Sequence, residues 1–236
     1  MNRIGSFFCC WAVLIFLRTT PIRSETFTFA VGEWPPYITS QSPGLGSHTQ
    51  TVKRIFDNAG IDLEFEFLPW QRSMEMTKNG TFPATFSWSF TKERAEDFYY
   101  STLSIDKIRY VHFYRKDRFP DGLGPLNFGM LRHQGLSVVA VKNYWYDKPL
   151  TKAGVNVHFV VTEEQAWSML FHKRADIYIE SLQVGEIQKR EFLGDDADNI
   201  AHTGPFREIP MFILFSKAHP DGRKLLKLWE AYAALN

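Results

Sequence analysis

The residues best suited to chemistry in this sequence are two serines and an arginine close together, Ser87, Ser89 and Arg94. An arginine guanidinium presents a planar fork of N–H groups that matches both oxygens of a carboxylate, and neighbouring hydroxyls add directed donors. The spacing alone leaves a second pairing open, in which Arg94 binds Glu96 or Asp97 on its own short helix. The group therefore indicates either a carboxylate-binding site or an ordinary surface ion pair.

Motifs of the common enzyme classes are missing from the sequence. It contains no phosphate-binding P-loop, no HExxH or CxxC metal motif and no GxSxG nucleophile elbow. The seven histidines are scattered without the spacing of metal ligands. Gly44 and Gly46 lack the third glycine of a dinucleotide-binding loop. We therefore expect no metal, no cofactor and no enzymatic activity.

The first 24 residues have the pattern of an export signal. Arg3 gives a positive start, and an unbroken run of eleven apolar residues extends from Phe7 to Leu17. Such a run is too short to cross a bilayer but suits a signal peptide. We expect cleavage near Ser24 and a periplasmic protein without stable membrane insertion. Both cysteines lie inside the apolar run, so we expect no disulfide in the mature chain.

Strand and helix patterns alternate after this segment. Apolar side chains at every second position from Phe27 to Val31 predict a half-buried strand, and two prolines then force a loop. Ser47 followed by Gln50 is a capping-box signature that predicts the start of a helix, and apolar residues from Val52 to Ala59 at helical spacing predict its buried stripe. A strand is expected over 61–67. These elements form a strand–loop–helix–strand unit.

The alternation continues to the end of the chain. Further strands are predicted over 82–88, 108–114, 137–141, 155–161, 177–179 and 211–215. Thr162 with Gln165 marks another helix start, and a helix closes the chain. Such patterns favour an open, largely parallel sheet covered by helices, with ligands at the carboxyl ends of strands.

Several short stretches resemble the bacterial extracellular solute-binding proteins of family 3. These stretches are Gly32 to Tyr37, Ala59 to Ile61, Leu68 to Arg72, Thr85 to Arg94, Tyr100 to Ser101 and Ala175 to Ile177. The resemblance implies an α/β fold, the periplasmic-binding-protein type 2 fold, with two lobes and a ligand cleft between them. After the signal segment 1–24, we expect a first lobe from 25–115 and 203–236, and a second lobe from 116–202 inserted into it.

The resemblance also implies which residues bind the ligand. The two serines and Arg94 would hold the ligand α-carboxylate, and Tyr37 matches an aromatic residue that stacks over the ligand. Trp70 and Trp88 are candidates to line the side-chain pocket, because an indole offers a broad apolar face. For Tyr37 a role as a loop anchor stays open, and for Trp70 a role in core packing.

The second lobe departs from the family pattern. The family has a glycine and small hydroxyl residues at a helix N-terminus, where this sequence has Asn143 to Tyr146, so Tyr144 is the candidate contact. The acid that binds the ligand ammonium corresponds to Ser181. Glu180, one place earlier, faces the other side of its strand and stays a candidate ligand-binding residue. Whether the ligand carries an α-amino group is therefore open.

We expect a monomeric periplasmic solute-binding protein for a small polar ligand, such as an amino acid or a related small carboxylate or amine. Lobe closure would capture the ligand, and an ABC permease would be its partner. Two alternatives remain: a cyclohexadienyl-dehydratase-like enzyme on the same fold, with Glu180 as its acid, and a stand-alone ligand sensor. The net charge of +1 argues against nucleic acid as a partner.

Overall fold

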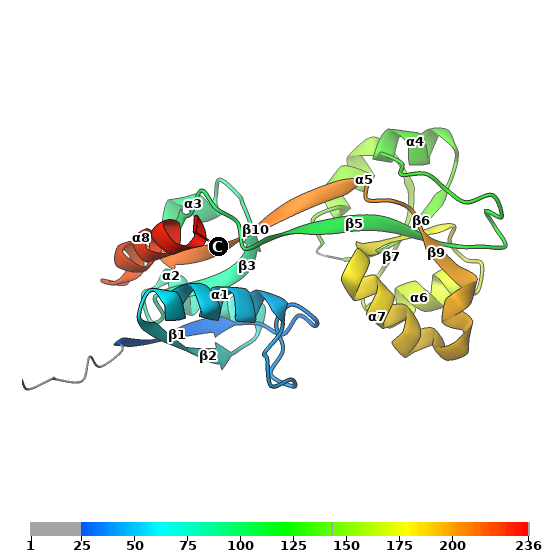
Figure 1. The fold of residues 1–236 in the computed structure, drawn as a ribbon. Coiled ribbons are helices and arrows are strands. Elements are labelled where there is room, and N and C mark those ends of the chain that lie inside the picture. The colour runs from blue at the N-terminus through cyan, green and yellow to red at the C-terminus, as the bar shows by residue number, and fades with distance from the viewer. Residues whose placement is uncertain (1–24, 143, 236) are drawn as a thin grey trace, which may run out of the picture.

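Two lobes joined by two long strands make up the computed structural model (Figure 1). The structure describes residues 25–142 and 144–235. The predicted signal segment 1–24 lies outside the described residues, as does Asn143. Among the described helices, none has the length and apolar character needed to span a membrane.

The first lobe is a small sheet covered by helices. Its elements are β1 (Glu25–Val31), α1 (Ser47–Asn58), β2 (Ile61–Phe67), α2 (Trp70–Lys78), β3 (Ala84–Ser89), α3 (Arg94–Asp97), β4 (Phe98–Tyr100) and α8 (Gly222–Ala233). β1 pairs in parallel with β2 and β3. The predicted apolar stripe of α1 is confirmed, because Val52, Ile55 and Phe56 are buried, and the Phe56 ring contacts Trp229 of α8.

The second lobe repeats this construction. Its elements are α4 (Phe128–His133), β6 (Ser137–Val141), α5 (Asp147–Ala153), β7 (Asn156–Val160), α6 (Glu163–Phe171), β8 (Ile177–Ser181), α7 (Leu182–Leu193), the 3-10 helix η1 (Gly194–Asn199) and β9 (Ile200–His202). β6 pairs in parallel with β7 and β8. A buried core beneath α6 includes Trp167, whose ring meets Phe113 and Tyr178 edge to face.

Two long strands, β5 (Asp106–Arg115) and β10 (Arg207–Ser216), connect the lobes. They pair with each other in antiparallel fashion through the first half of each strand. β10 then joins β3 in the first lobe, and β5 joins β8 in the second. The strand order is therefore β2-β1-β3-β10-β5-β8-β6-β7. The predicted two-lobed α/β fold is confirmed, whereas the lobe boundaries at residues 115 and 202 stay a prediction.

The two predicted capping boxes have different outcomes. The Thr162 hydroxyl accepts a hydrogen bond from the Gln165 backbone N–H, as expected for the start of α6. The capping box at Ser47 is wrong, because Gly46 is the N-cap of α1 and no side chain caps the helix. The Ser47 and His48 backbone N–H groups instead donate to the carbonyls of Pro36 and Tyr37. The start of α1 is thus held by the loop that follows β1.

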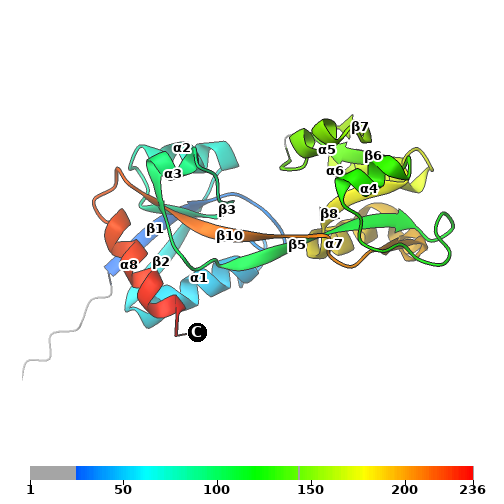
Figure 2. The same ribbon diagram turned by 90° about the horizontal axis from the view of Figure 1, so that it is seen from above.

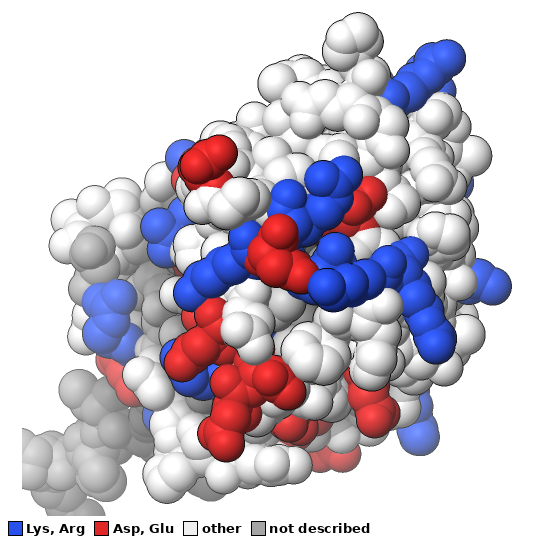
Figure 3. All heavy atoms as spheres, turned by 90° about the vertical axis from the view of Figure 1, so that its right-hand side faces the viewer, with Lys and Arg blue, Asp and Glu red and all other residues white. Residues whose placement is uncertain are grey.

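Acidic and basic side chains lie next to one another on the end face of the second lobe (Figure 3). Two ion pairs of this lobe are Arg118 with Asp176 at 3.0 Å and Lys173 with Asp117 at 2.8 Å. The electrostatic potentials of neighbouring positive and negative side chains largely cancel at a distance from the surface. This face therefore does not offer the single-sign surface that binds a nucleic-acid backbone.

Candidate ligand-binding site

A cavity of about 300 Å³ has lining residues from both lobes. Trp34, Trp70, Ser87 and Trp88 line it from the first lobe, and Tyr144 lines it from the second. The helices α2 and α5, which begin at or just after some of these residues, lie on the same side of the connecting strands (Figure 2). Four of these five residues were predicted from the sequence. Trp34 was missed, although it lies inside the Gly32 to Tyr37 stretch that carried the family resemblance.

A β-bulge in β3 brings Ser87 and Trp88 to the same cavity. In the pairing with β10, Trp88 lies opposite Phe212 and Phe86 lies opposite Ile213, so Ser87 has no partner residue. Ser87 has a φ of 70°, in the left-handed region. Neighbouring residues of a regular strand face opposite sides, whereas a bulge changes the direction of a side chain. The bulge therefore lets two consecutive residues line one cavity.

The aromatic walls of the cavity are fixed by contacts with the protein. The Trp70 and Trp88 rings meet edge to face, with centres 5.0 Å apart. The Trp70 Nε1–H donates to the Glu33 carbonyl at 3.1 Å, and the Trp88 Nε1–H donates to Thr85 Oγ1 at 3.2 Å. On the opposite wall, the Tyr144 hydroxyl donates to a Glu163 carboxylate oxygen at 2.8 Å. These residues present rings to the cavity, because their polar hydrogens are directed at protein acceptors.

Arg94 and Ser89 lie next to the cavity and are not among the residues that line it. The Arg94 guanidinium carbon lies 4.8 Å from the centre of the Trp88 ring, and its Nη1 donates to the Ser89 carbonyl at 3.0 Å. Asp97 pairs with Lys78 at 2.8 Å instead of with Arg94. Within residues 25–142 and 144–235, Arg94 forms no ion pair. Its charge therefore has no carboxylate partner in the described part of the chain.

Tyr37 lines a different cavity, of about 270 Å³, beside the connecting strands. The other lining residues are Asp106, Lys107, Arg109, Leu182, Gln183 and Glu208. Tyr37 is only 2% exposed, and burial raises the pKa of its hydroxyl to about 12, opposed by the neighbouring Ser181 side chain. Its ring packs against Trp34, with centres 4.6 Å apart. Tyr37 therefore adjoins the interlobe cavity through Trp34.

His48, in the first turn of α1, connects the two cavities. Its Nδ1 lies 2.8 Å from Ser87 Oγ, its ring centre lies 4.5 Å from that of Tyr37, and its Nε2 lies 3.5 Å from Asp106 Oδ2. The side chain is buried, and desolvation lowers its pKa to about 4, so the ring is neutral near pH 7. Sequence reasoning missed His48, because nothing in its neighbours along the chain signals a contact with Ser87.

Glu180 is buried at the carboxyl end of β8 and does not line the interlobe cavity. Its carboxylate accepts hydrogen bonds from the Ser181 backbone N–H at 2.6 Å and from the Tyr178 hydroxyl at 3.2 Å. Burial raises the pKa of Glu180 to about 7. Burial, together with the negative charge of Glu180, raises the pKa of five tyrosines, which are Tyr37, Tyr110, Tyr144, Tyr146 and Tyr178.

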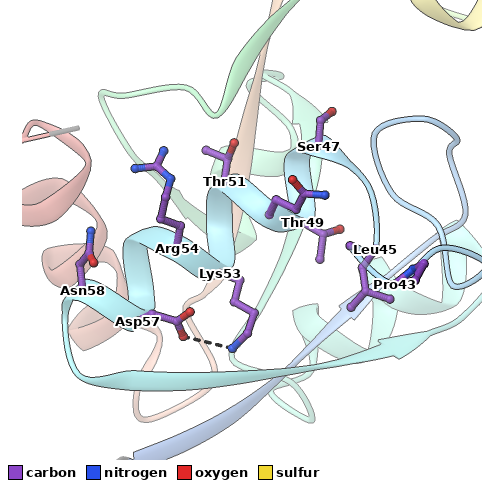
Figure 4. Close-up of a pocket in the computed structure, with 11 residues that line it drawn as sticks. Pro43, Leu45, Ser47, Thr49, Thr51, Lys53, Arg54, Asp57 and Asn58 are labelled. Atoms are coloured by element: carbon purple, nitrogen blue, oxygen red, sulfur yellow. Dashed lines mark hydrogen bonds and ion pairs between the residues drawn. The ribbon is translucent and has the colours of Figure 1, made fainter.

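A hollow of about 740 Å³ runs along α1 (Figure 4). Its residues all belong to 43–58, and Lys53 binds Asp57 there at 3.1 Å. No residue of the second lobe lines this hollow, in contrast to the interlobe cavity. Among the described residues, no group of three His, Cys, Asp or Glu side chains is arranged to hold a metal ion.

Comparisons with known proteins bear on the fold. No family model matches the sequence, and neither does any curated protein. A histidine kinase sensor domain with similarity to periplasmic binding proteins matches with a TM-score of 0.66 at 18% identity, over 90% of this chain and 92% of that chain. Holo ArgBP from T. maritima matches with a TM-score of 0.61 at 17% identity, over 89% and 90%.

An ancestral amino acid-binding protein, described as a precursor of cyclohexadienyl dehydratase, matches with a TM-score of 0.63 at 15% identity. This match covers 89% of this chain and 88% of that one. At such low identity the likeness concerns the arrangement of the backbone. The chain has the two-lobed α/β fold of periplasmic binding proteins.

Proposed function

We propose that this protein captures a small polar ligand, such as an amino acid or a related small carboxylate or amine, between its two lobes. The observation that carries the proposal is the interlobe cavity, which takes its walls from Trp34, Trp70, Ser87 and Trp88 on one lobe and Tyr144 on the other. A ligand that contacts both lobes stabilises the closed arrangement relative to an open one. Binding and closure are therefore coupled.

The remaining parts of the proposal follow from the sequence and from similar folds. The signal pattern over 1–24 supports a periplasmic location, and the amino-acid-binding protein among the matches supports capture of a small polar ligand. We further propose that the protein serves an ABC-type importer as a monomer. The match to a histidine kinase sensor domain favours a second candidate function, in which the same cavity reports a ligand without transport. The burial of Glu180 argues against the dehydratase alternative, because an acid catalyst must reach its substrate.

Native mass spectrometry of the freshly purified protein is the first test. A co-purified small molecule would identify the ligand class directly. Isothermal titration against amino acids, small carboxylates and amines then gives the affinity. If no small molecule is retained and none of these compounds binds, the proposed function is wrong.

Replacement of Trp88 by alanine is expected to weaken binding of any ligand found in this way. The ring forms one wall of the cavity and holds Trp70 in its edge-to-face position. We expect a loss of affinity of about tenfold or more, as for buried aromatic anchors. Isothermal titration measures the loss. The matched control is Phe159→Ala, which removes an exposed ring on β7 and should leave the affinity unchanged.

Replacement of Arg94 by alanine is expected to weaken carboxylate ligands selectively. Its charge has no carboxylate partner in the described part of the chain, and charge-assisted hydrogen bonds are strong. We expect carboxylates to lose about tenfold in affinity, while amines without a carboxylate are unaffected. Lys92→Ala removes an exposed charge two residues away and serves as the control. Equal carboxylate affinities for Arg94→Ala and the wild type would contradict this role.

A further inference from the structure

The interlobe cavity offers few hydrogen-bond donors to a ligand. Trp70, Trp88 and Tyr144 direct their N–H or O–H groups at Glu33, Thr85 and Glu163. Ser87 is the remaining hydroxyl of the lining, and a hydroxyl carries one proton and two acceptor lone pairs. Whether the cavity offers the ligand a hydrogen-bond donor or an acceptor therefore depends on the direction of the Ser87 O–H.

His48 decides the direction of that proton. In a neutral imidazole one ring nitrogen carries the proton and the other accepts, and the hydrogen bond at one nitrogen sets the role of the other. The Asp106 carboxylate lies 3.5 Å from His48 Nε2, and a negative charge there favours the proton on that nitrogen. Nδ1 is then the acceptor for the Ser87 hydroxyl at 2.8 Å. The Ser87 oxygen is left with lone pairs for the cavity.

The rest of the lining, like the Ser87 lone pairs, favours a positively charged group of the ligand. The faces of tryptophan and tyrosine rings carry negative quadrupole charge and attract cations. The Glu163 carboxylate accepts from Tyr144 on one wall. The positive charge of Arg94 lies at the Trp88 side, which leaves Ser87 and Tyr144 as the end of the cavity suited to a cation.

We infer that His48 is a positioning residue that makes Ser87 a hydrogen-bond acceptor, so that the aromatic cavity binds the protonated amine of its ligand. This inference rests on the proposed function, because it concerns the ligand of the same cavity. It reverses the role that the family resemblance implies for Ser87, which was to donate to a carboxylate. A ligand that carries both groups places its amine at Ser87 and its carboxylate toward Arg94.

Nitrogen-15 NMR of the histidine rings tests the first step on the unmodified protein. We expect the His48 signals of a neutral ring with the proton on Nε2 and an unprotonated Nδ1. The opposite tautomer would make Ser87 a donor to the ligand and would overturn the inference. This measurement needs no ligand and no substitution.

Isothermal titration with butylamine, butyrate and γ-aminobutyrate tests the second step. The wild type is expected to bind butylamine about tenfold or more tightly than butyrate, which corresponds to one hydrogen bond to a charged group. His48→Phe frees the Ser87 proton and should lower this ratio by about tenfold, whereas His48→Gln retains an acceptor oxygen and should keep it. A merely structural role of His48 would weaken both probes alike and leave the ratio unchanged.

The outcomes separate this inference from the proposed function. A wild type that prefers butyrate, or a ratio that His48→Phe does not alter, overturns the inference alone. The proposed function survives in that case if other ligands bind and Trp88→Ala weakens them. If none of the three probes binds, the inference is wrong. If the wider ligand screen also finds nothing, the proposed function fails with it.

Discussion

At about pH 8, the Glu180→Gln variant is expected to be more stable than the wild type by about 3 kcal/mol, whereas at about pH 4.5 the two proteins should be nearly equal. Glutamine has the shape of a protonated glutamate: its carbonyl oxygen can accept from the Ser181 N–H, and its NH2 group, like the O–H of the protonated acid, can donate to the Tyr178 hydroxyl oxygen. The variant therefore keeps the neutral form that the folded site prefers.

The direction follows from the pKa of the buried carboxyl. Burial raises the pKa of Glu180 from 4.5 to about 7, so between these values the unfolded chain is ionised and the folded protein still holds its proton. Stability is fully present below about pH 4.5 and falls by about 1.4 kcal/mol per pH unit until the folded group ionises near pH 7. The variant has no group to titrate at this position and escapes the loss.

Urea unfolding of both proteins at several pH values measures the difference. Other titrations, such as that of His48, cancel because both proteins share them. Glu191→Gln removes an exposed carboxylate on α7 and should differ from the wild type by a constant amount over the same range. A constant difference for Glu180→Gln as well would show that the buried site accommodates the charge.

Replacement of Gly46 by alanine should have a second large effect, on both stability and binding. Gly46 has a φ of 91°, and an added Cβ would lie 2.4 Å from the carbonyl oxygen of Tyr37, 2.5 Å from its carbon and 2.7 Å from the Ile38 nitrogen. These are backbone atoms, so the clash cannot be relieved by a rotamer change. We expect a loss of unfolding free energy of about 2 kcal/mol or more. Binding should weaken as well, because His48 and Tyr37 lie on either side of this contact.

The matched control for this prediction is Gly60→Ala. Gly60 also has a positive φ, of 76°, but an added Cβ there meets nothing within 4 Å. The Gly60→Ala variant should lose only about 1 kcal/mol of unfolding free energy, from the backbone strain of a positive φ. Denaturant unfolding of both variants separates the clash from the strain. Equal losses for the two variants would contradict the close approach of α1 to the loop after β1.

The sequence predicts the fold well because the fold depends on patterns that are local. Apolar alternation marks β1 and β2, and the stripe of α1 packs as expected. Four candidate residues from the sequence, Trp70, Ser87, Trp88 and Tyr144, line the interlobe cavity, since each lies near a strand end or a helix start; their contact with a ligand stays a prediction. The opposite directions of Glu180 and Ser181 along β8 agree with a regular strand: Glu180 contacts Tyr178, and Ser181 adjoins Tyr37.

The remaining features of the site depend on pairings between distant parts of the chain. Ser87 and Trp88 share a cavity because β3 has one residue more than the segment of β10 that it pairs with, and that strand follows more than a hundred residues later. The contact of His48 with Ser87 spans 39 residues and depends on the same bulge. Neither segment of the sequence, considered by itself, predicts the strand register or the contact of His48 with Ser87.

Three of the tryptophans in this chain, Trp34, Trp70 and Trp88, surround the interlobe cavity, while Trp167 and Trp229 are fully buried elsewhere. Indole emission changes with the polarity and polarisability of what touches the ring. The protein therefore carries its own optical reporter of cleft occupancy, set against a constant background from the buried indoles. Entry of the proposed ligand would change the emission of the three cavity indoles with no label attached.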